Sequence, residues 1–415
     1  MDDKNNTLRI YDVAEKLNVS QKSVRKYIHS GKLKSNRIGG VHHVQKSDLQ
    51  YFLDLSIYEN GKEEKIIPLK KKSTETDIVN WVDISDEWEN VKPNNFTSAD
   101  LFCGAGGMAK GFELAGFNQI GGLDWFKEAG MTYRQNFKHP LIEGDITDND
   151  VKKNFIDTVK KQLNGKDLTV LSGGFPCQGF SMSGSRIVED ERNSLYKDML
   201  EIIKDLQPQF IVAENVKGLR SMLKGKVEDK IKQDIRSLGY DVNVTVLNSA
   251  DYYVPQKRER IIFIANRIGK NNFHPTSMLD EGSYVTTKEA IEDLINLEDN
   301  KEFSHVRTKH KDEMKQRLSA VPEGKSLYDN YSDAWKKCPW NEASCTIKEN
   351  HGGVNIHPVE PRVITIREMA RLQSFPDDFI FKGSKGKQMI QLGNAVPPLL
   401  AKAIALGIKK AIEEK

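Results

Sequence analysis

The stretch "SADLFCGAGGMAKGFELAGF", residues 98–117, contains three patterns in direct succession. An apolar run that leads to Phe102 predicts a buried strand. Gly104 and Gly106 then permit a tight turn and the close approach of a ligand to the backbone. Apolar side chains follow at helical spacing, on one face of a predicted helix: Met108, Phe112 and Ala115. A strand that passes through a glycine turn into a helix is typical of the first unit of an α/β sheet.

The same alternation of short apolar runs and amphipathic helices continues along the chain. Apolar runs predict strands at residues 97–102, 168–171, 210–213, 242–247 and 261–265. Helical spacing is kept between these runs by Tyr196, Met199, Ile203 and Leu206, and by Val227, Ile231, Ile235 and Leu238. The pattern predicts a parallel sheet whose strands are joined by crossover helices.

Acidic residues stand at the ends of successive predicted strands. Asp124 and Trp125 end the segment "IGGLDW", and Asp145 follows in "EGDI". A carboxylate there can hydrogen-bond a ribose, an indole can stack on a purine, and neighbouring acids disfavour a polyphosphate. This end of the sheet is therefore predicted to bind a nucleoside cofactor. Taken alone, the glycine turn is explained equally well by helix–sheet packing.

A single cysteine is presented in the stretch "GGFPCQGFSMSG", residues 173–184. Cys177 follows the predicted strand "LTVLSGG", at the carboxyl end of the sheet, where such folds carry their chemistry. Pro176 restricts the backbone before it, and the flanking glycines allow a sharp, exposed turn. The loop is therefore predicted to present the sulfur.

Two further segments carry candidate catalytic groups. Glu214 follows an apolar run in "IVAENV", so its pKa is expected to be raised and it is suited to donate a proton. The segment "VPQKRERIIFI" places Gln256, Arg258 and Arg260 at alternating positions, so their side chains are expected on one face. The alternative for Glu214 is a structural acid held in a salt bridge. The alternative for the other three residues is a solvated strand edge.

The N-terminal segment has charge of one sign. Between residues 16 and 46 the chain carries eight Lys or Arg and no Asp or Glu. Two short amphipathic helices joined by a turn are followed by "RIGGVHHV", which predicts a hairpin with Gly39 and Gly40 at its turn. The segment resembles winged helix-turn-helix modules of the MerR and excisionase type. The resemblance implies a DNA-facing second helix with Gln21, Lys22, Arg25 and Lys26. A basic helical hairpin that contacts other proteins is the alternative.

The region from 97 to 410 resembles bacterial cytosine-5 DNA methyltransferases. The motifs that carry the resemblance stand in the family's order: "DLFCGAGG", "FPCQGFS", "ENV", "QKRER", "RVITIREMARLQSFPDDF" and "QLGNAVPP". It implies a Rossmann-like S-adenosylmethionine-dependent methyltransferase fold with a smaller target-recognition domain. The expected division is a winged helix-turn-helix domain at 1–55, a linker at 56–93, catalytic segments at 94–269 and 361–415, and the target-recognition domain at 270–360.

The resemblance also implies an activity, in which a methyl group passes from S-adenosylmethionine to carbon 5 of a flipped cytosine in double-stranded DNA. Cys177 would be the nucleophile, assisted by Glu214, Arg258 and Arg260, and no metal is required. Gln178, Ser181 and Gln256 are expected to contact DNA. The expected cofactor site consists of Phe102, Gly104, Gly106, Asp124, Trp125, Asp145, Ile146, Leu195 and Asn394.

Three other functions stay open at this point: a DNA-binding regulator that retains the fold without catalysis, an RNA cytosine-5 methyltransferase, and a Rossmann dehydrogenase. The last leaves the cysteine, glutamate and paired arginines unexplained. If the protein is a DNA methyltransferase, a restriction endonuclease that acts on the same DNA site is its expected partner.

Composition places the chain in a broad class. No apolar run approaches the roughly 18 residues of a membrane helix. The N-terminus lacks the pattern of a secretory signal, so we expect a cytoplasmic protein without a membrane partner. The four cysteines are too scattered for a disulfide framework or a zinc site, and Cys103, Cys338 and Cys345 are expected to be ordinary thiols.

Overall fold

The structure is a computed structural model. It describes residues 7–17, 19, 21–29, 33–38, 41–49, 52, 79–176, 194–329, 335–348 and 354–414. Structural statements below concern these residues.

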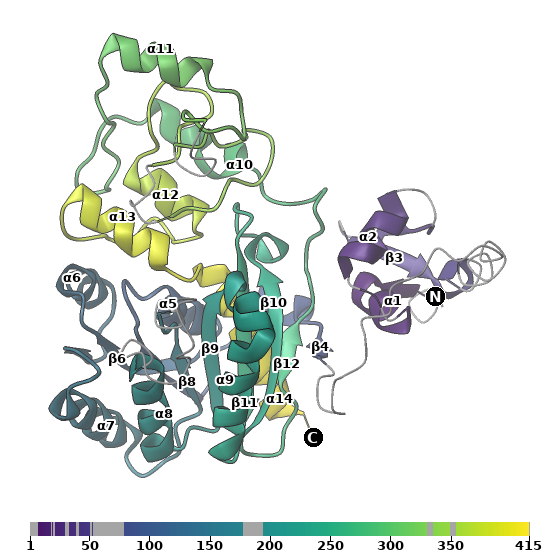
Figure 1. Cartoon of the computed structure of the whole chain (residues 1–415), viewed down its shortest axis with the longest axis vertical. Helices are drawn as coiled ribbons and strands as arrows, with labels where there is room; N and C mark the ends of the chain where they lie inside the picture. Colours follow the sequence, from purple (N-terminus) through teal and green to yellow (C-terminus); the bar gives the residue numbers. More distant parts are fainter. Residues whose placement is uncertain are drawn as a thin grey trace.

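The region expected to be catalytic, called the catalytic domain below, is built on a seven-stranded sheet with strand order β10-β11-β9-β8-β5-β6-β7 (Figure 1). The strands are β5 (Thr97–Leu101), β6 (Asn118–Asp124), β7 (Leu141–Glu143), β8 (Val170–Gly173), β9 (Phe210–Val216), β10 (Asp241–Asn248) and β11 (Glu259–Asn266). All five predicted strands are present, and the α/β fold class is confirmed.

The prediction of a parallel sheet is wrong at one edge. The ladders joining β5 to β6 and β8, β6 to β7, and β8 to β9 are parallel, whereas β11 pairs antiparallel with both β9 and β10. The segment between β10 and β11 holds only the short 3-10 helix η5 (Ser249–Tyr252) in place of a crossover helix. A connection this short can join antiparallel neighbours but not parallel ones.

Helices cover both faces of the sheet. Side chains of α7 (Asn149–Leu163), α8 (Ser194–Leu206) and α9 (Lys226–Ser237) form one hydrophobic core with it. Those of α5 (Gly107–Leu114) and α14 (Pro398–Glu413) form the core on the other face. The span Lys385–Glu413 is apolar enough to cross a membrane, but 72% of its most apolar window is buried inside the protein, as in a core helix.

A second lobe stands above the carboxyl edge of the sheet in Figure 1. It contains α10 (Thr287–Ile291), the 3-10 helix η6 (Glu292–Asn296), α11 (Asp312–Ala320), α12 (Ile366–Leu372) and α13 (Lys385–Asn394). One hydrophobic core joins α10, α12 and α13 to α6 (Lys127–Asn136) of the catalytic domain. The closing segment from 361 thus contributes α12 and α13 to this lobe before α14 returns to the sheet.

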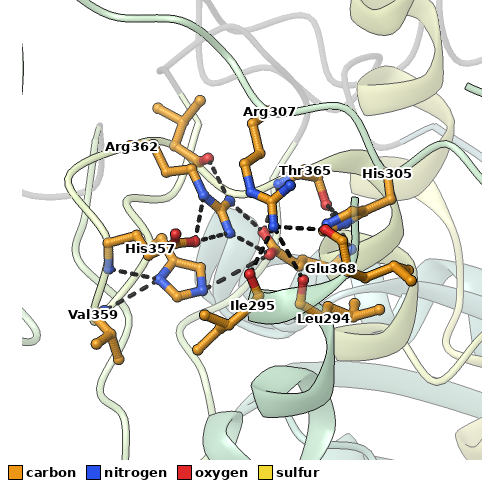
Figure 2. A network of polar contacts seen from close by, with 12 residues as sticks. Leu294, Ile295, His305, Arg307, His357, Val359, Arg362, Thr365 and Glu368 are labelled. Carbon is orange, nitrogen blue, oxygen red and sulfur yellow. Dashed lines mark hydrogen bonds and ion pairs between the residues drawn. The ribbon is translucent and has the colours of Figure 1, made fainter. Parts of the chain in front are cut away.

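A buried polar network fixes the start of α12 (Figure 2). Arg362 donates from both terminal nitrogens to the carboxylate of Glu368, at 2.8 and 2.7 Å. The same carboxylate accepts from the backbone N–H of Thr365 at 2.7 Å, which closes a capping box. Nδ1 of His357 accepts from the backbone N–H of Val359 at 3.2 Å. The loop before α12 is therefore held by charge-assisted bonds.

The residues expected to form a linker up to 93 are partly folded. Strand β4 (Asn80–Val82) pairs in parallel with β12 (Phe273–Pro275), and α4 (Ser85–Trp88) follows it. Trp88 is buried, stacks on Tyr253 and lies under the ammonium group of Lys402. Because an isolated tryptophan creates no hydrophobic period, the sequence pattern did not reveal this contact. Residues 56–78 lie outside the described residues.

The N-terminal module has the predicted helix-turn-helix and wing. It consists of β1 (Thr7–Arg9), α1 (Ile10–Lys16), α2 (Gln21–His29), β2 (Asn36–Ile38) and β3 (Val41–Gln45). Strands β2 and β3 pair antiparallel, and β1 adds a third strand that the sequence did not reveal. The turn residues Gly39 and Gly40 lie outside the described residues.

Candidate active site

The turn after β5 is held by a carboxylate of the neighbouring strand. Backbone N–H groups of Gly104 and Phe126 donate to the two oxygens of Asp124, each at 2.7 Å. Burial raises the pKa of Asp124, and these two donors oppose that shift. Gly104 and Phe102 both adopt positive φ. The turn is thus bent sharply towards the carboxyl edge of the sheet.

The two glycines of this turn have different surroundings. A Cβ on Gly104 would meet no described atom within 4 Å, whereas one on Gly106 would lie 2.3 Å from the ring of Phe137. Packing therefore requires a glycine at position 106, which agrees with the alternative explanation that the turn serves helix–sheet packing. The space at Gly104 fits a ligand that approaches the backbone closely.

The other expected cofactor residues lie at the ends of neighbouring strands. Trp125, at the end of β6, is 74% exposed and leaves its indole face free for an aromatic ring. Asp145 follows β7 and accepts from the backbone N–H and the hydroxyl of Thr147, both at 2.9 Å. Ile146 is buried, Leu195 packs against the sheet core, and Asn394 is exposed at the end of α13. This chemistry fits a nucleoside with one aromatic face and several hydroxyls.

Glu214 and Arg260 form a pair on adjacent strands. Oε1 of Glu214 on β9 lies 2.8 Å from Nε of Arg260 on β11, and the side chains are 11% and 13% exposed. Burial raises the pKa of Glu214, and the charges of Arg260 and Arg258 act in the opposite direction. The net direction is upward, so the carboxyl holds its proton to higher pH than an ordinary glutamate does.

This pair lies beside the base of the cysteine loop. A Cβ on Gly174 would lie 3.0 Å from Oε2 of Glu214. The next residue of β9, Asn215, donates its amide to the carbonyl of Phe175 at 2.8 Å. Asn215 is a positioning residue that the sequence analysis did not single out, although it stands inside the quoted "ENV". Cys177, Gln178 and Ser181 lie outside the described residues, since the described segment before them ends at Pro176 and the next begins at Ser194.

Arg258 does not share the orientation of Arg260. Its buried guanidinium donates to three backbone carbonyls, and burial lowers its pKa. These carbonyls belong to Ile347, Gly393 and Ala395, at 2.8, 2.8 and 3.1 Å. Arg258 thus ties the start of β11 to the second lobe and to the chain after α13.

Gln256 is also directed inward, so the expected DNA contact does not fit its position. It has no exposed surface, and its amide donates to the carbonyl of Leu372 at 3.0 Å and to Oε1 of Gln373 at 2.9 Å. Its Oε1 accepts from the backbone N–H of Ile347 at 2.7 Å. All of these bonds join the catalytic domain to the second lobe.

Comparison with known proteins decides the family. Residues 96–410 match the C-5 cytosine-specific DNA methylase family, and residues 7–54 match a helix-turn-helix domain family. The chain belongs to the C-5 cytosine-specific DNA methylase family. It is an enzyme of the type II DNA cytosine-5 methyltransferase group, which excludes the dehydrogenase reading.

The similar proteins cover most of the chain. The type II methyltransferase M1.HphI of Haemophilus parahaemolyticus is 36% identical over 331 residues, which span 76% of this chain and 87% of that protein. M.Eco47II of Escherichia coli is 30% identical over 97% of this chain and 95% of its own length. A solved structure of a putative DNA modification methyltransferase encoded in an E. coli prophage has 26% identity and a TM-score of 0.63. It matches 77% of this chain and 100% of its own.

Proposed function

We propose that this methyltransferase transfers the methyl group of S-adenosylmethionine to carbon 5 of a flipped cytosine through a covalent bond to Cys177. The observation that carries the proposal is the contact between Glu214 and Arg260 at 2.8 Å. This pair lies beside Gly174, which stands three residues before Cys177 in the sequence. The pair would join a carboxyl whose pKa is raised and a fixed cation at the carboxyl edge of the sheet, where the chain leads into the segment that carries Cys177.

The residues would act in a fixed order. The Cys177 thiolate adds to carbon 6 of the ring while Glu214 gives its proton, or a hydrogen bond, to ring nitrogen 3. The electron pair of the 5,6 double bond then becomes available at carbon 5, which is otherwise a poor nucleophile. When bound, S-adenosylmethionine supplies the electrophilic methyl group. Once carbon 5 is methylated, loss of its proton to solvent restores the double bond, the Cys177 thiolate leaves, and the proton on ring nitrogen 3 returns to Glu214.

Arg260 has two roles in this scheme. Its bond to Glu214 orients the carboxyl, and its remaining N–H groups can hold the cytosine carbonyl oxygen. Its positive charge also favours the thiolate of Cys177 over the thiol. Arg258 acts as a positioning residue, because both of its terminal nitrogens are already bonded to backbone carbonyls.

The burial of Glu214 requires an extruded base. Glu214 is 8% exposed, so a paired cytosine inside a duplex cannot reach it. Flipping costs a few kcal/mol of lost stacking and pairing. We assign Gln178 and Ser181 to the loop that accompanies this step, and residues 270–360 to reading the target sequence. A cytoplasmic location and a restriction endonuclease that acts on the same DNA site are part of this proposal.

The carboxyl edge of the sheet supplies the proposed cofactor site. Trp125 would stack on the adenine, and the carboxylates would bond the ribose hydroxyls and the amino acid end. The space over Gly104 fits a close backbone contact. The assigned residues are Phe102, Gly104, Gly106, Asp124, Trp125, Asp145, Ile146, Leu195 and Asn394.

The direct test is incubation of mixed-sequence DNA with S-adenosylmethionine labelled in its methyl group, followed by bisulfite sequencing. We expect label in DNA and protected cytosines in one recurring sequence. Label transferred to RNA but not to DNA would contradict the substrate. DNA binding without transfer by the folded protein would favour a regulator without catalysis.

A further inference from the structure

Helix α2, the helix expected to read DNA, contacts the methyltransferase domain. Nη2 of Arg25 donates to the hydroxyl of Ser277 at 3.1 Å. The same hydroxyl lies 3.1 Å from Oε1 of Gln21 and 2.9 Å from Oδ2 of Asp251. Gln21 and Arg25 are two of the four residues expected to face DNA, and both are bonded to one serine of the methyltransferase domain.

Two more contacts join the same faces. Arg9, at the end of β1, forms an ion pair with Asp83, between β4 and α4. Nε2 of His42 on β3 lies 3.1 Å from Oδ2 of Asp280. The module is therefore held at three points, through β1, α2 and β3. A chance contact by one long side chain would join the two domains at a single point, whereas three separate elements of the module make contacts here.

The receiving face is rigid and acidic. The carboxylate of Asp251 also accepts from the hydroxyl of Tyr284 at 2.6 Å. Backbone N–H groups of Met278 and Leu279 donate to the carbonyl of Asp251, each at 3.0 Å, which fixes the loop that carries Ser277. Three carboxylates thus lie opposite the basic module: Asp83, Asp251 and Asp280.

We propose that this acidic face is the docking site of helix α2, and that docking and DNA binding by the module exclude each other. The reason is chemical, since the polar groups of Gln21 and Arg25 that would bond base edges or phosphates are bonded to Ser277. DNA phosphates compete with carboxylates for the same cations. The proposal rests on the helix-turn-helix module and does not depend on the chemistry at Cys177.

The test changes the receiving face and leaves the module intact. In the full chain, S277Y is designed to fill the space that Gln21 and Arg25 occupy, and D83N removes the negative charge that pairs with Arg9. We expect D83N/S277Y to bind a fluorescein-labelled pool of random short duplexes about tenfold tighter than the unchanged chain, because no free energy is then spent on undocking. The milder D83N/S277A should shift affinity in the same direction by less. D167N is the matched charge control and should leave affinity unchanged, because Asp167 is exposed, pairs with Arg267 and precedes β8, at the edge of the sheet opposite the active site.

Two added measurements identify the source of any gain. Adding R25A to D83N/S277Y should cancel it, and the radius of gyration from small-angle X-ray scattering should rise when the module is released. Unchanged DNA affinity in both undocking variants overturns the proposal, as does a gain that survives R25A. Methylation by the same proteins is measured in parallel, so a failure of the catalytic proposal is recognised separately.

Discussion

At the scale of single residues, the site depends on one buried carboxyl whose pKa is raised. The pKa of Glu214 rises because burial removes water from the charged form, and Arg260 only partly offsets this. The methylation rate should therefore fall as pH rises through that pKa, because the proton-bearing form is lost. A structural ion pair would show no such dependence.

Replacing Glu214 by glutamine tests this role. E214Q keeps an acceptor for Arg260 and an amide N–H that can hydrogen-bond ring nitrogen 3, but it cannot transfer a proton. We therefore expect the single-turnover methylation rate to fall about 10²- to 10⁴-fold and its high-pH decline to disappear. E259Q is the matched control, because Glu259 is exposed and pairs with Lys217 at the surface. A rate near that of the unchanged enzyme in E214Q would contradict the assignment.

At the scale of elements, the sequence predicted the strands and helices whose burial repeats periodically, and it missed features that leave no periodic pattern. The predicted strands and amphipathic helices are present, since alternating burial leaves a pattern in the sequence. The reversed strand β11, the buried Trp88 and the inward turn of Gln256 were missed. Each depends on contacts with residues far along the chain, which no local pattern contains.

The network before α12 gives a prediction for this element. Burial lowers the pKa of His357 to about 4, although Glu368 acts to raise it. The fold therefore favours neutral His357. The contribution of neutral His357 to the free energy of unfolding is complete above its pKa in the unfolded chain, about 6.5. It is lost as the pH falls towards its pKa in the folded protein, about 4. The loss amounts to about 3 kcal/mol at most.

The replacement H357Q should remove this part of the acid sensitivity. Glutamine can still accept from the N–H of Val359 but does not titrate between pH 6.5 and 4. Denaturant unfolding across this range should give a shallower fall in the free energy of unfolding than in the unchanged protein. Identical slopes would show that His357 is not buried in its neutral form.

At the scale of the whole molecule, the boundary between module and enzyme lies before Asn80. Strand β4 and helix α4 belong to the catalytic fold through β12 and the core around α14. The module itself has a separate hydrophobic core. Removing the module and removing β4 with α4 should therefore have different consequences.

Two truncations compare these consequences. Deleting residues 1–55 should leave the methylation rate unchanged, because the active site lies wholly beyond that point. Deleting residues 1–92 also removes Ile84 and Trp88 and should lower the free energy of unfolding by at least about 3 kcal/mol, the cost of losing one buried tryptophan. Inactivity of a folded 1–55 deletion, or full stability of the longer one, would contradict this boundary.

The most direct measurement concerns the bond between Cys177 and the base. A duplex that carries 5-fluorocytosine at the mapped target is incubated with the protein and S-adenosylmethionine, then run on a denaturing gel. Fluorine cannot leave as a proton does, so the account predicts a stable protein–DNA adduct with the unchanged enzyme and none with C177A. Methylation of ordinary DNA without an adduct on the fluorinated duplex, or an adduct that persists in C177A, would contradict it.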